Sequence, residues 1–335
     1  MINTQAERLI LLSPEQLFKS LHQSQDRQAI RDGDDAEYRA YLNFYNLDMQ
    51  KLYPAVKHKL SVFEAAGERL VAQSFKSGAN SPELVNSPEP INILGIAIIV
   101  HGYYDHVGLY GHLIRYCLEQ NLDVYCFDLP GHGLSTGPRA SIDSFQNYQT
   151  ALDEFIAQIC PAQAQQRCLF GQSMGGAIIM DHLLSNFAGQ NTSPYTKVAL
   201  FAPLVRPAAW PINKWVFALL RHFTREQKRS FAKNSHDVDF LEFVKNDPLQ
   251  ASVLPIAWVA AMADWVVRFV DLAPCELEVL VLQGTHDSTV DWKYDLGIIR
   301  EKFAPKILSL DAARHHLVNE SEPYRQKMFD FITSN

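Results

Sequence analysis

Ser173 stands at the centre of the most informative stretch of the sequence, Gly171-Gln-Ser-Met-Gly175. The apolar run before it, residues 168–170, predicts a strand, and the run after it, residues 176–180, predicts a helix. A G-x-S-x-G pattern between strand and helix is typical of a nucleophile elbow, a tight turn that projects the serine hydroxyl beyond the sheet edge. The pattern alone is weak, since a glycine-rich turn carries it by chance, so its context gives it weight.

A serine hydroxyl needs a base, usually histidine, and an acid that orients the base. After a nucleophile elbow, the acid and then the histidine follow in chain order. Asp287 comes just past a strand predicted over residues 277–282, and His315 lies in the loop after a strand predicted over residues 306–310. We therefore favour Ser173, Asp287 and His315 as the catalytic residues.

Each partner of Ser173 has rivals. Asp291 and Asp295 lie further from the strand end, at the start and inside of the next predicted helix, and a lone turn aspartate such as Asp287 is usually only solvated. His316 competes with His315, because only one of the two rings can face Ser173. If His315 does, we expect His316 to be a partly exposed residue at a helix start.

Ester cleavage through a serine also needs two backbone N–H groups that bind the developing oxyanion. Met174, the residue after the nucleophile, is expected to supply one of them. The unbroken apolar run over residues 96–100 predicts a central parallel strand, and Tyr103 in the loop after it is the expected second donor. The alternative that His101, His106 and His112 bind a metal in this region fits no zinc spacing.

Four blocks of sequence, spread over about residues 92–332, resemble the α/β-hydrolases of the monoacylglycerol lipase and lysophospholipase group, which lies near the S33 serine aminopeptidases. The blocks are residues 101–110, 127–135, 171–176, and 283–287 with 314–320. The resemblance implies the same catalytic residues and oxyanion donors, no cofactor or metal, and a lysophospholipid or monoacylglycerol as substrate. Family members usually carry Glu in place of Asp105, and often Glu or Val in place of His316.

Strand and helix patterns alternate along the chain, which predicts a mostly parallel central sheet with helices on both faces. The resemblance makes this an α/β-hydrolase fold with an inserted helical lid. We expect a helical arm over residues 1–60, a first part of the core over 61–203, the lid over 204–270 and a second part of the core over 271–335. Residues 68–76 predict an antiparallel edge strand, and residues 78–90 a loop.

The predicted lid carries large apolar side chains. Trp258 and Met262 belong to a stripe at helical spacing that continues with Trp265 and Phe269. The simpler interpretation is that this stripe packs the lid onto the core; the functional one is that Trp210, Trp215, Trp258 and Met262 line a pocket for an acyl chain. The apolar segment 215–220 could also rest on a membrane surface as an interfacial helix.

Composition fits an enzyme that acts on a small molecule. The 335 residues are 47% hydrophobic, enough for a large core and an inserted lobe, and the net charge of −7 without a basic run argues against a nucleic-acid partner. The five cysteines lack metal or redox spacing, which suits a reducing compartment. Residues 10–12 are too short an apolar run for a leader, so we expect a cytoplasmic location, with peripheral contact to the inner membrane surface as a further hypothesis.

Two other functions remain open at this stage. An aminopeptidase or amidase could use the same three catalytic residues, but it would need carboxylates in the lid to receive a free amine. Those available are Glu226, Asp237, Asp239 and Glu242. A binding protein of the same fold without catalysis is the other alternative, and the complete serine, acid and histidine set argues against it.

Overall fold

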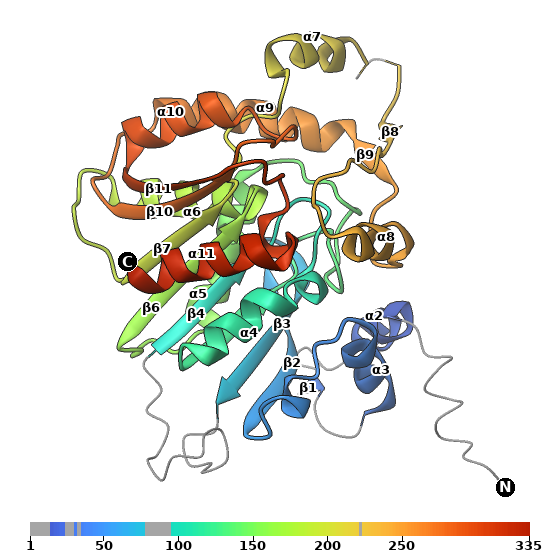
Figure 1. Ribbon diagram of the computed structural model, residues 1–335. Coiled ribbons are helices and arrows are strands. Elements are labelled where there is room, and N and C mark those ends of the chain that lie inside the picture. Colours follow the sequence, from blue (N-terminus) through green and yellow to red (C-terminus); the bar gives the residue numbers. More distant parts are fainter. Residues whose placement is uncertain (1–13, 24–29, 32–34, 78–94, 221–222) are drawn as a thin grey trace, which may run out of the picture.

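The computed structural model describes residues 14–23, 30–31, 35–77, 95–220 and 223–335 (Figure 1). The loop predicted over residues 78–90 and the apolar run over residues 10–12 lie outside the described residues. Within the described part of the chain, no helix is both long and apolar enough to cross a membrane.

The core of the molecule is one nine-stranded sheet with the order β1-β2-β3-β5-β4-β6-β7-β10-β11. The six strands from β5 to β11 in this order run parallel to one another, as predicted. They are β4 (Gly95–Val100), β5 (Leu122–Phe127), β6 (Gln166–Gln172), β7 (Lys197–Phe201), β10 (Glu278–Gly284) and β11 (Ala304–Leu310).

Helices cover both faces of this sheet, as predicted for a parallel sheet with apolar strands. In β4, Ile96 and Ile98 face a core shared with α5 (Gln146–Gln158), α6 (Met174–Phe187) and α10 (Trp292–Lys302). The intervening Ala97 and Ile99 face a second core, shared with α4 (Gly111–Glu119) and α11 (Glu322–Ser334). The strand is therefore buried along its whole length, and its carboxyl end is fixed from both sides.

The start of the sheet differs from the prediction. The predicted strand forms as β3 (Glu68–Ser77) and is antiparallel, but it lies inside the sheet between β2 (Val56–Ala65) and β5. The edge is β1 (Ile30–Arg31), which pairs with β2. β2 carries an alternation of buried and exposed residues at its start, a two-residue period that indicates a strand and that we did not assign.

Two helices precede β2 in the predicted arm, α2 (Pro14–Gln23) and α3 (Ala36–Phe44). The side chain of Asp35 accepts a hydrogen bond from the backbone N–H of Tyr38 and caps α3. Tyr38 and the neighbouring Tyr41, Leu42 and Tyr45 are all buried. This aromatic face packs in the second core, as the predicted helical spacing indicates.

The chain between β7 and β10 contains three helices and a small two-stranded sheet. In order they are α7 (Trp210–Leu220), β8 (Glu226–Lys228), α8 (Val238–Asn246), β9 (Val253–Pro255) and α9 (Ile256–Asp271). Strands β8 and β9 pair only with each other, and α7 and α8 stand apart from the main sheet (Figure 1). The expected helical insertion therefore contains a short antiparallel pair of strands, separated in the chain by α8, that the sequence patterns do not predict.

Candidate active site

Ser173 lies in a sharp turn between β6 and α6. Its backbone has φ 53° and ψ −114°, a conformation that costs a non-glycine residue about 1–3 kcal/mol and is found mostly at functional sites. Two glycines make the turn fit. A Cβ atom on Gly175 would lie 2.1 Å from the carbonyl oxygen of Val100, and one on Gly171 would lie 2.7 Å from that of Gly175. The strand, turn and helix context predicted for Ser173 is therefore present.

The three predicted catalytic side chains meet in one hydrogen-bonded chain. His315 Nε2 lies 2.9 Å from the hydroxyl of Ser173, and His315 Nδ1 lies 2.7 Å from Asp287 Oδ2. All three residues are buried. A carboxylate at Nδ1 keeps the proton on that nitrogen, so Nε2 is left to accept the serine proton.

Asp287 is held as an ionised acceptor. Its second oxygen, Oδ1, accepts hydrogen bonds from the backbone N–H groups of Thr289 at 2.8 Å and Val290 at 3.2 Å. Burial by itself would raise the pKa of this carboxyl, but His315 and these backbone donors outweigh it and lower the pKa below its ordinary value. The carboxylate therefore remains charged beside the imidazole.

The rival acids contact other groups. Asp291 directly precedes α10, where its side chain makes no capping hydrogen bond, and it pairs with Arg206 at 2.7 Å. Asp295 accepts backbone hydrogen bonds from Val205 and Arg206, which follow β7, and burial raises its pKa well above the ordinary value. Neither carboxylate has a hydrogen bond to His315 among the described residues.

Two backbone N–H groups lie next to Ser173 in the chain or in the adjacent loop. Met174 is the first residue of α6, and Tyr103 follows Gly102, whose added Cβ would lie 3.5 Å from the Cβ of Ser173. Neither N–H donates a hydrogen bond to another group in the described part of the chain. Free donors at a helix N-terminus and in an adjacent loop are the arrangement that an oxyanion requires.

His316 differs from its prediction. It is buried, not partly exposed, and its Nε2 lies 3.1 Å from Asp105 Oδ2. Burial alone would raise the pKa of Asp105, but His316 and the hydroxyl of Tyr110 hold it well below its ordinary value. The same Tyr110 hydroxyl accepts a hydrogen bond from the backbone N–H of Gly102. Asp105 thus connects the Tyr103 loop with the loop that carries the two histidines.

Gln172 is a further positioning residue that the sequence analysis did not single out. Its side-chain amide donates to the carbonyl oxygen of His315 at 2.9 Å and accepts from the backbone N–H of Val318 at 3.4 Å. It occupies a variable position of the G-x-S-x-G pattern, so the motif gives no signal for this role. The contact fixes the backbone of the histidine loop against the elbow.

The histidines weighed as metal ligands are engaged elsewhere. His101 Nε2 accepts from the backbone N–H of Leu129, and Nδ1 donates to the carbonyl oxygen of Gly102. His106 Nε2 lies 2.8 Å from Asp247, while His112 is exposed on α4. His101 and His106 therefore hold the loop after β4 in place through hydrogen bonds.

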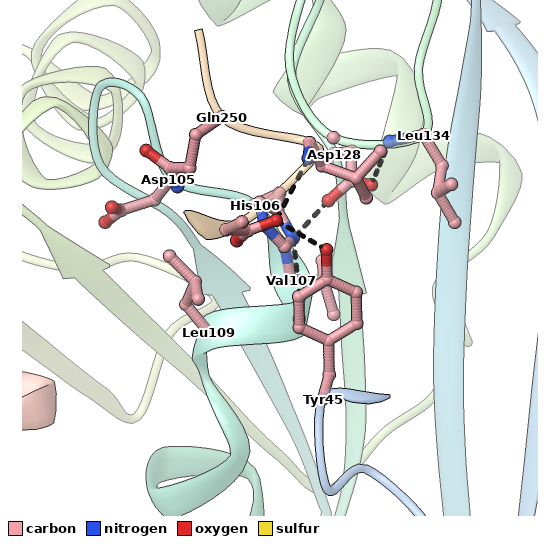
Figure 2. A network of polar contacts seen from close by, with 12 residues as sticks. Tyr45, Asp105, His106, Val107, Leu109, Asp128, Leu134 and Gln250 are labelled. Atoms are coloured by element: carbon pink, nitrogen blue, oxygen red, sulfur yellow. Dashed lines mark hydrogen bonds and ion pairs between the residues drawn. The ribbon is translucent and has the colours of Figure 1, made fainter. Parts of the chain in front are cut away.

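A network around His106 joins three distant parts of the chain (Figure 2). Asp247, just after α8, accepts hydrogen bonds from His106 at 2.8 Å and from the hydroxyl of Tyr45 at 2.7 Å. Beside it, Asp128 accepts backbone hydrogen bonds from Val107 and Leu134, both at 2.7 Å. The carboxyl end of α8 is thereby fixed to the loop after β4 and to the segment after α3.

A cavity of about 370 Å³ opens at Ser173 and His315. Its apolar wall comes from α8, through Val238, Phe240, Leu241 and Val244. The segment after β8 and the Tyr103 loop supply a more polar wall.

The four aromatic and apolar residues predicted to bind substrate do not line this cavity. Trp258 and Met262 are buried on the core-facing side of α9, where Trp258 stacks on the ring of Tyr103 at 3.7 Å. Trp210 is also buried, and Trp215 is 73% exposed. The helical stripe of the sequence is thus the packing face of α9, and the apolar wall comes from α8 instead.

The comparisons with known proteins agree with this architecture. The sequence profile of the family described as "Serine aminopeptidase, S33" matches residues 92–322, well over half of the chain. The chain belongs to this family. Its relatives include the phospholipase YtpA of Bacillus subtilis, 26% identical over 59% of this chain and 78% of that protein. A monoglyceride lipase of Mus musculus is 24% identical over 68% of this chain and 77% of that protein.

Solved structures show the fold. A soluble variant of monoglyceride lipase from Saccharomyces cerevisiae superposes with a TM-score of 0.65 at 14% identity, over 82% of this chain and 94% of that one. This protein therefore has the α/β-hydrolase fold, as the resemblance of its sequence blocks indicates.

Proposed function

We propose that this α/β-hydrolase is a serine hydrolase that cleaves carboxylic esters through an acyl-enzyme. The observation that carries the proposal is the buried chain of hydrogen bonds from Ser173 through His315 to Asp287 at the floor of a cavity. Ser173 attacks the ester carbonyl while His315 takes its proton, and Asp287 stabilises the imidazolium.

The backbone N–H groups of Tyr103 and Met174 bind the oxyanion in this mechanism. His315 then gives this proton to the leaving alcohol as the bond between the acyl group and the alcohol breaks. The acyl group remains bound to Ser173 as a new ester. A water molecule, deprotonated by His315, attacks this acyl-enzyme and releases the acid. The mechanism needs no organic cofactor or metal, since every proton is carried by His315.

The proposed substrate is a single-chain lipid ester. Relatives named as a phospholipase and a monoglyceride lipase support this substrate class. The apolar wall supplied by α8 gives an acyl chain a surface to pack against. Both observations favour a lysophospholipid or a monoacylglycerol over a short, polar ester.

The aminopeptidase alternative has weaker support. Of the four lid carboxylates that could receive a free amine, only Glu242 lines the cavity, and it pairs with Lys245 at 3.1 Å. Glu226, Asp237 and Asp239 lie away from the lining. A non-catalytic binding protein would have no need for the strained serine and its aligned histidine.

The acyl wall predicts how rate depends on chain length. For p-nitrophenyl esters, kcat/KM should rise up to about fourfold per added methylene and then level off, because each buried methylene contributes about 0.8 kcal/mol. Leu241→Ala on α8 should shift the chain length at which the rise stops. Met262→Ala, on the core side of α9, should lower the melting temperature but leave unchanged the chain length at which the rise in kcat/KM stops. A flat profile, together with cleavage of aminoacyl arylamides, would favour the aminopeptidase.

We further propose that α7 contacts a membrane surface. Ile212, Trp215, Val216 and Leu219 follow the spacing of one helix face and are between 49% and 73% exposed. An exposed apolar face of this kind on a helix that stands apart from the core is typical of interfacial helices.

This contact predicts vesicle binding that depends on α7. Trp215→Ala combined with Leu219→Ala should weaken co-sedimentation with phospholipid vesicles by tenfold or more, since burying each side chain contributes roughly 1.5–3 kcal/mol. Val267→Ala is the matched control, because Val267 is 68% exposed on α9. Equal sedimentation of both variants and the unaltered protein would remove α7 as the contact.

A further inference from the structure

The wall of the active-site cavity carries an excess of positive charge. Three cationic side chains line it, Arg229, Lys233 and Lys245, against two carboxylates, Asp105 and Glu242. Both carboxylates are already paired, Asp105 with His316 and Glu242 with Lys245. In the described part of the chain, neither Arg229 nor Lys233 has an ion pair, so two cationic side chains line the cavity without a directly paired carboxylate.

Arg229 is fixed in place although it lacks an acidic partner. Its guanidinium lies over the rings of Tyr104, at 3.9 Å, and Phe231, at 4.4 Å from the ring centroids. Its Nη1 donates to the side chain of Gln250 at 2.5 Å and to the carbonyl oxygen of Ala251 at 3.1 Å. The Nε and Nη2 donors of Arg229 make no hydrogen bond to the described residues. One edge of the planar guanidinium group is therefore available to bind a ligand.

Holding this charge at the cavity has a cost that a ligand would offset. Burial lowers the pKa of Arg229, because the guanidinium is partly removed from water. A partly buried cation is stabilised by a paired anion, and arginine forms two parallel hydrogen bonds with a phosphate or carboxylate. Elsewhere in the cavity lining, His316 Nδ1 is buried without a hydrogen-bond partner among the described residues.

We propose that Arg229 and Lys233 form a subsite for a phosphate group on the alcohol part of the ester substrate. The inference rests on the proposed function and narrows its substrate class to lysophospholipids, in preference to neutral monoacylglycerols. It also gives a physical reason against the aminopeptidase, because two cations without a direct ion pair disfavour a free ammonium group beside them.

The two walls of the cavity are expected to contact different parts of the substrate. Most of the apolar residues come from α8, whose Glu242 and Lys245 pair with each other, whereas Arg229 and Lys233 come from the segment that follows β8. An acyl chain packs on the first wall, and a charged group is excluded from it by desolvation. The phosphate is therefore assigned to the leaving alcohol, on the opposite side of the ester from the acyl chain.

A binding experiment tests the subsite without relying on turnover. Ether lipids contain no ester, so 1-O-dodecylglycerol 3-phosphate and 1-O-dodecylglycerol report binding alone, below their micellar concentrations, by calorimetry. The unaltered protein should bind the phosphate ligand at least about tenfold more tightly. Arg229→Gln should reduce this preference by roughly tenfold or more, as expected for hydrogen bonds to a charged group, and Lys233→Gln by a few fold, as expected for an exposed charge.

Lys228→Gln is the matched control. Lys228 is exposed, precedes Arg229 directly and does not line the cavity, so it removes the same charge from the same segment. It should leave the preference unchanged. Glycerol 3-phosphate serves as the second probe, because it carries the phosphate without the chain. If it binds as tightly as the ether phospholipid, the site takes free phosphates and the headgroup assignment is overturned.

Hydrolysis of the matching esters separates this inference from the proposed function. The ratio of kcat/KM for 1-lauroylglycerol 3-phosphate over 1-lauroylglycerol should fall in Arg229→Gln by the same factor as the binding preference. Equal losses on both esters would mean that Arg229 only supports the wall, and would overturn the subsite. If the unaltered protein cleaves no ester, the proposed function fails, while the binding preference still decides the subsite.

Discussion

Replacing Ser173 with alanine should abolish both ester hydrolysis and covalent labelling by a fluorophosphonate. Ser173 is the hydroxyl aligned with His315, at 2.9 Å from Nε2, and its strained turn directs it into the cavity. Removal of a serine nucleophile of this kind lowers kcat by about six orders of magnitude. Turnover of p-nitrophenyl butyrate and gel detection of the labelled protein measure the two effects, and circular dichroism checks that the variant is folded.

Ser230 offers a matched control for this prediction. It lines the same cavity, but it has no hydrogen bond to a histidine in the described part of the chain. Ser230→Ala should therefore be labelled like the unaltered protein. Labelling that persists in Ser173→Ala and disappears in Ser230→Ala would place the nucleophile at the second serine and overturn the proposed mechanism.

The sequence predicts that these three side chains come together because each of them is placed by local structure. Ser173 follows β6 and begins a helix, Asp287 follows β10, and His315 lies in the loop after β11. Carboxyl ends of parallel strands meet at one edge of a sheet, so residues just past these ends converge. Strand ends are visible as breaks in apolar runs, which is why chain order and motif suffice to bring three distant residues together.

The environment of His316 could not be predicted in the same way. Its partner, Asp105, is 211 residues away in the chain, and no local pattern links a histidine in one loop to a carboxylate in another. A polar residue in a loop is expected at the surface, yet here both side chains are buried and satisfy each other through a hydrogen bond. The pairing depends on how two loops pack, which is a property of the whole fold.

The predicted substrate-binding residues Trp258 and Met262 lie outside the cavity for a related reason. The stripe on α9 is the stronger apolar pattern, but a stripe at helical spacing indicates only that one face is buried, not what covers it. In the structure, the core covers it. Helix α8 is shorter, and charged residues interrupt its apolar ones, so its apolar pattern is weaker in the sequence. In the structure it has no fully buried residue. A cavity wall has this character, since it stays open until a ligand binds.

A large effect on turnover is also expected from the acid. Asp287→Asn should lower kcat for p-nitrophenyl butyrate by about three to four orders of magnitude. An asparagine still fills the site and can accept the backbone hydrogen bonds of Thr289 and Val290, so the fold and KM should change little. What it loses is the charge that keeps the proton on His315 Nδ1 and stabilises the imidazolium. Steady-state kinetics and thermal unfolding measure these two outcomes separately.

Asp291→Asn is the control that decides between the two candidate acids. Asp291 lies four residues from Asp287 at the start of α10, but its carboxylate pairs with Arg206. Its replacement should therefore alter kcat by less than tenfold, with any larger change confined to stability. A loss below tenfold in Asp287→Asn, together with a severe loss in Asp291→Asn, would move the acid to Asp291. In that case His315 must turn away from Asp287 during the reaction, and the hydrogen bond between them would be structural only.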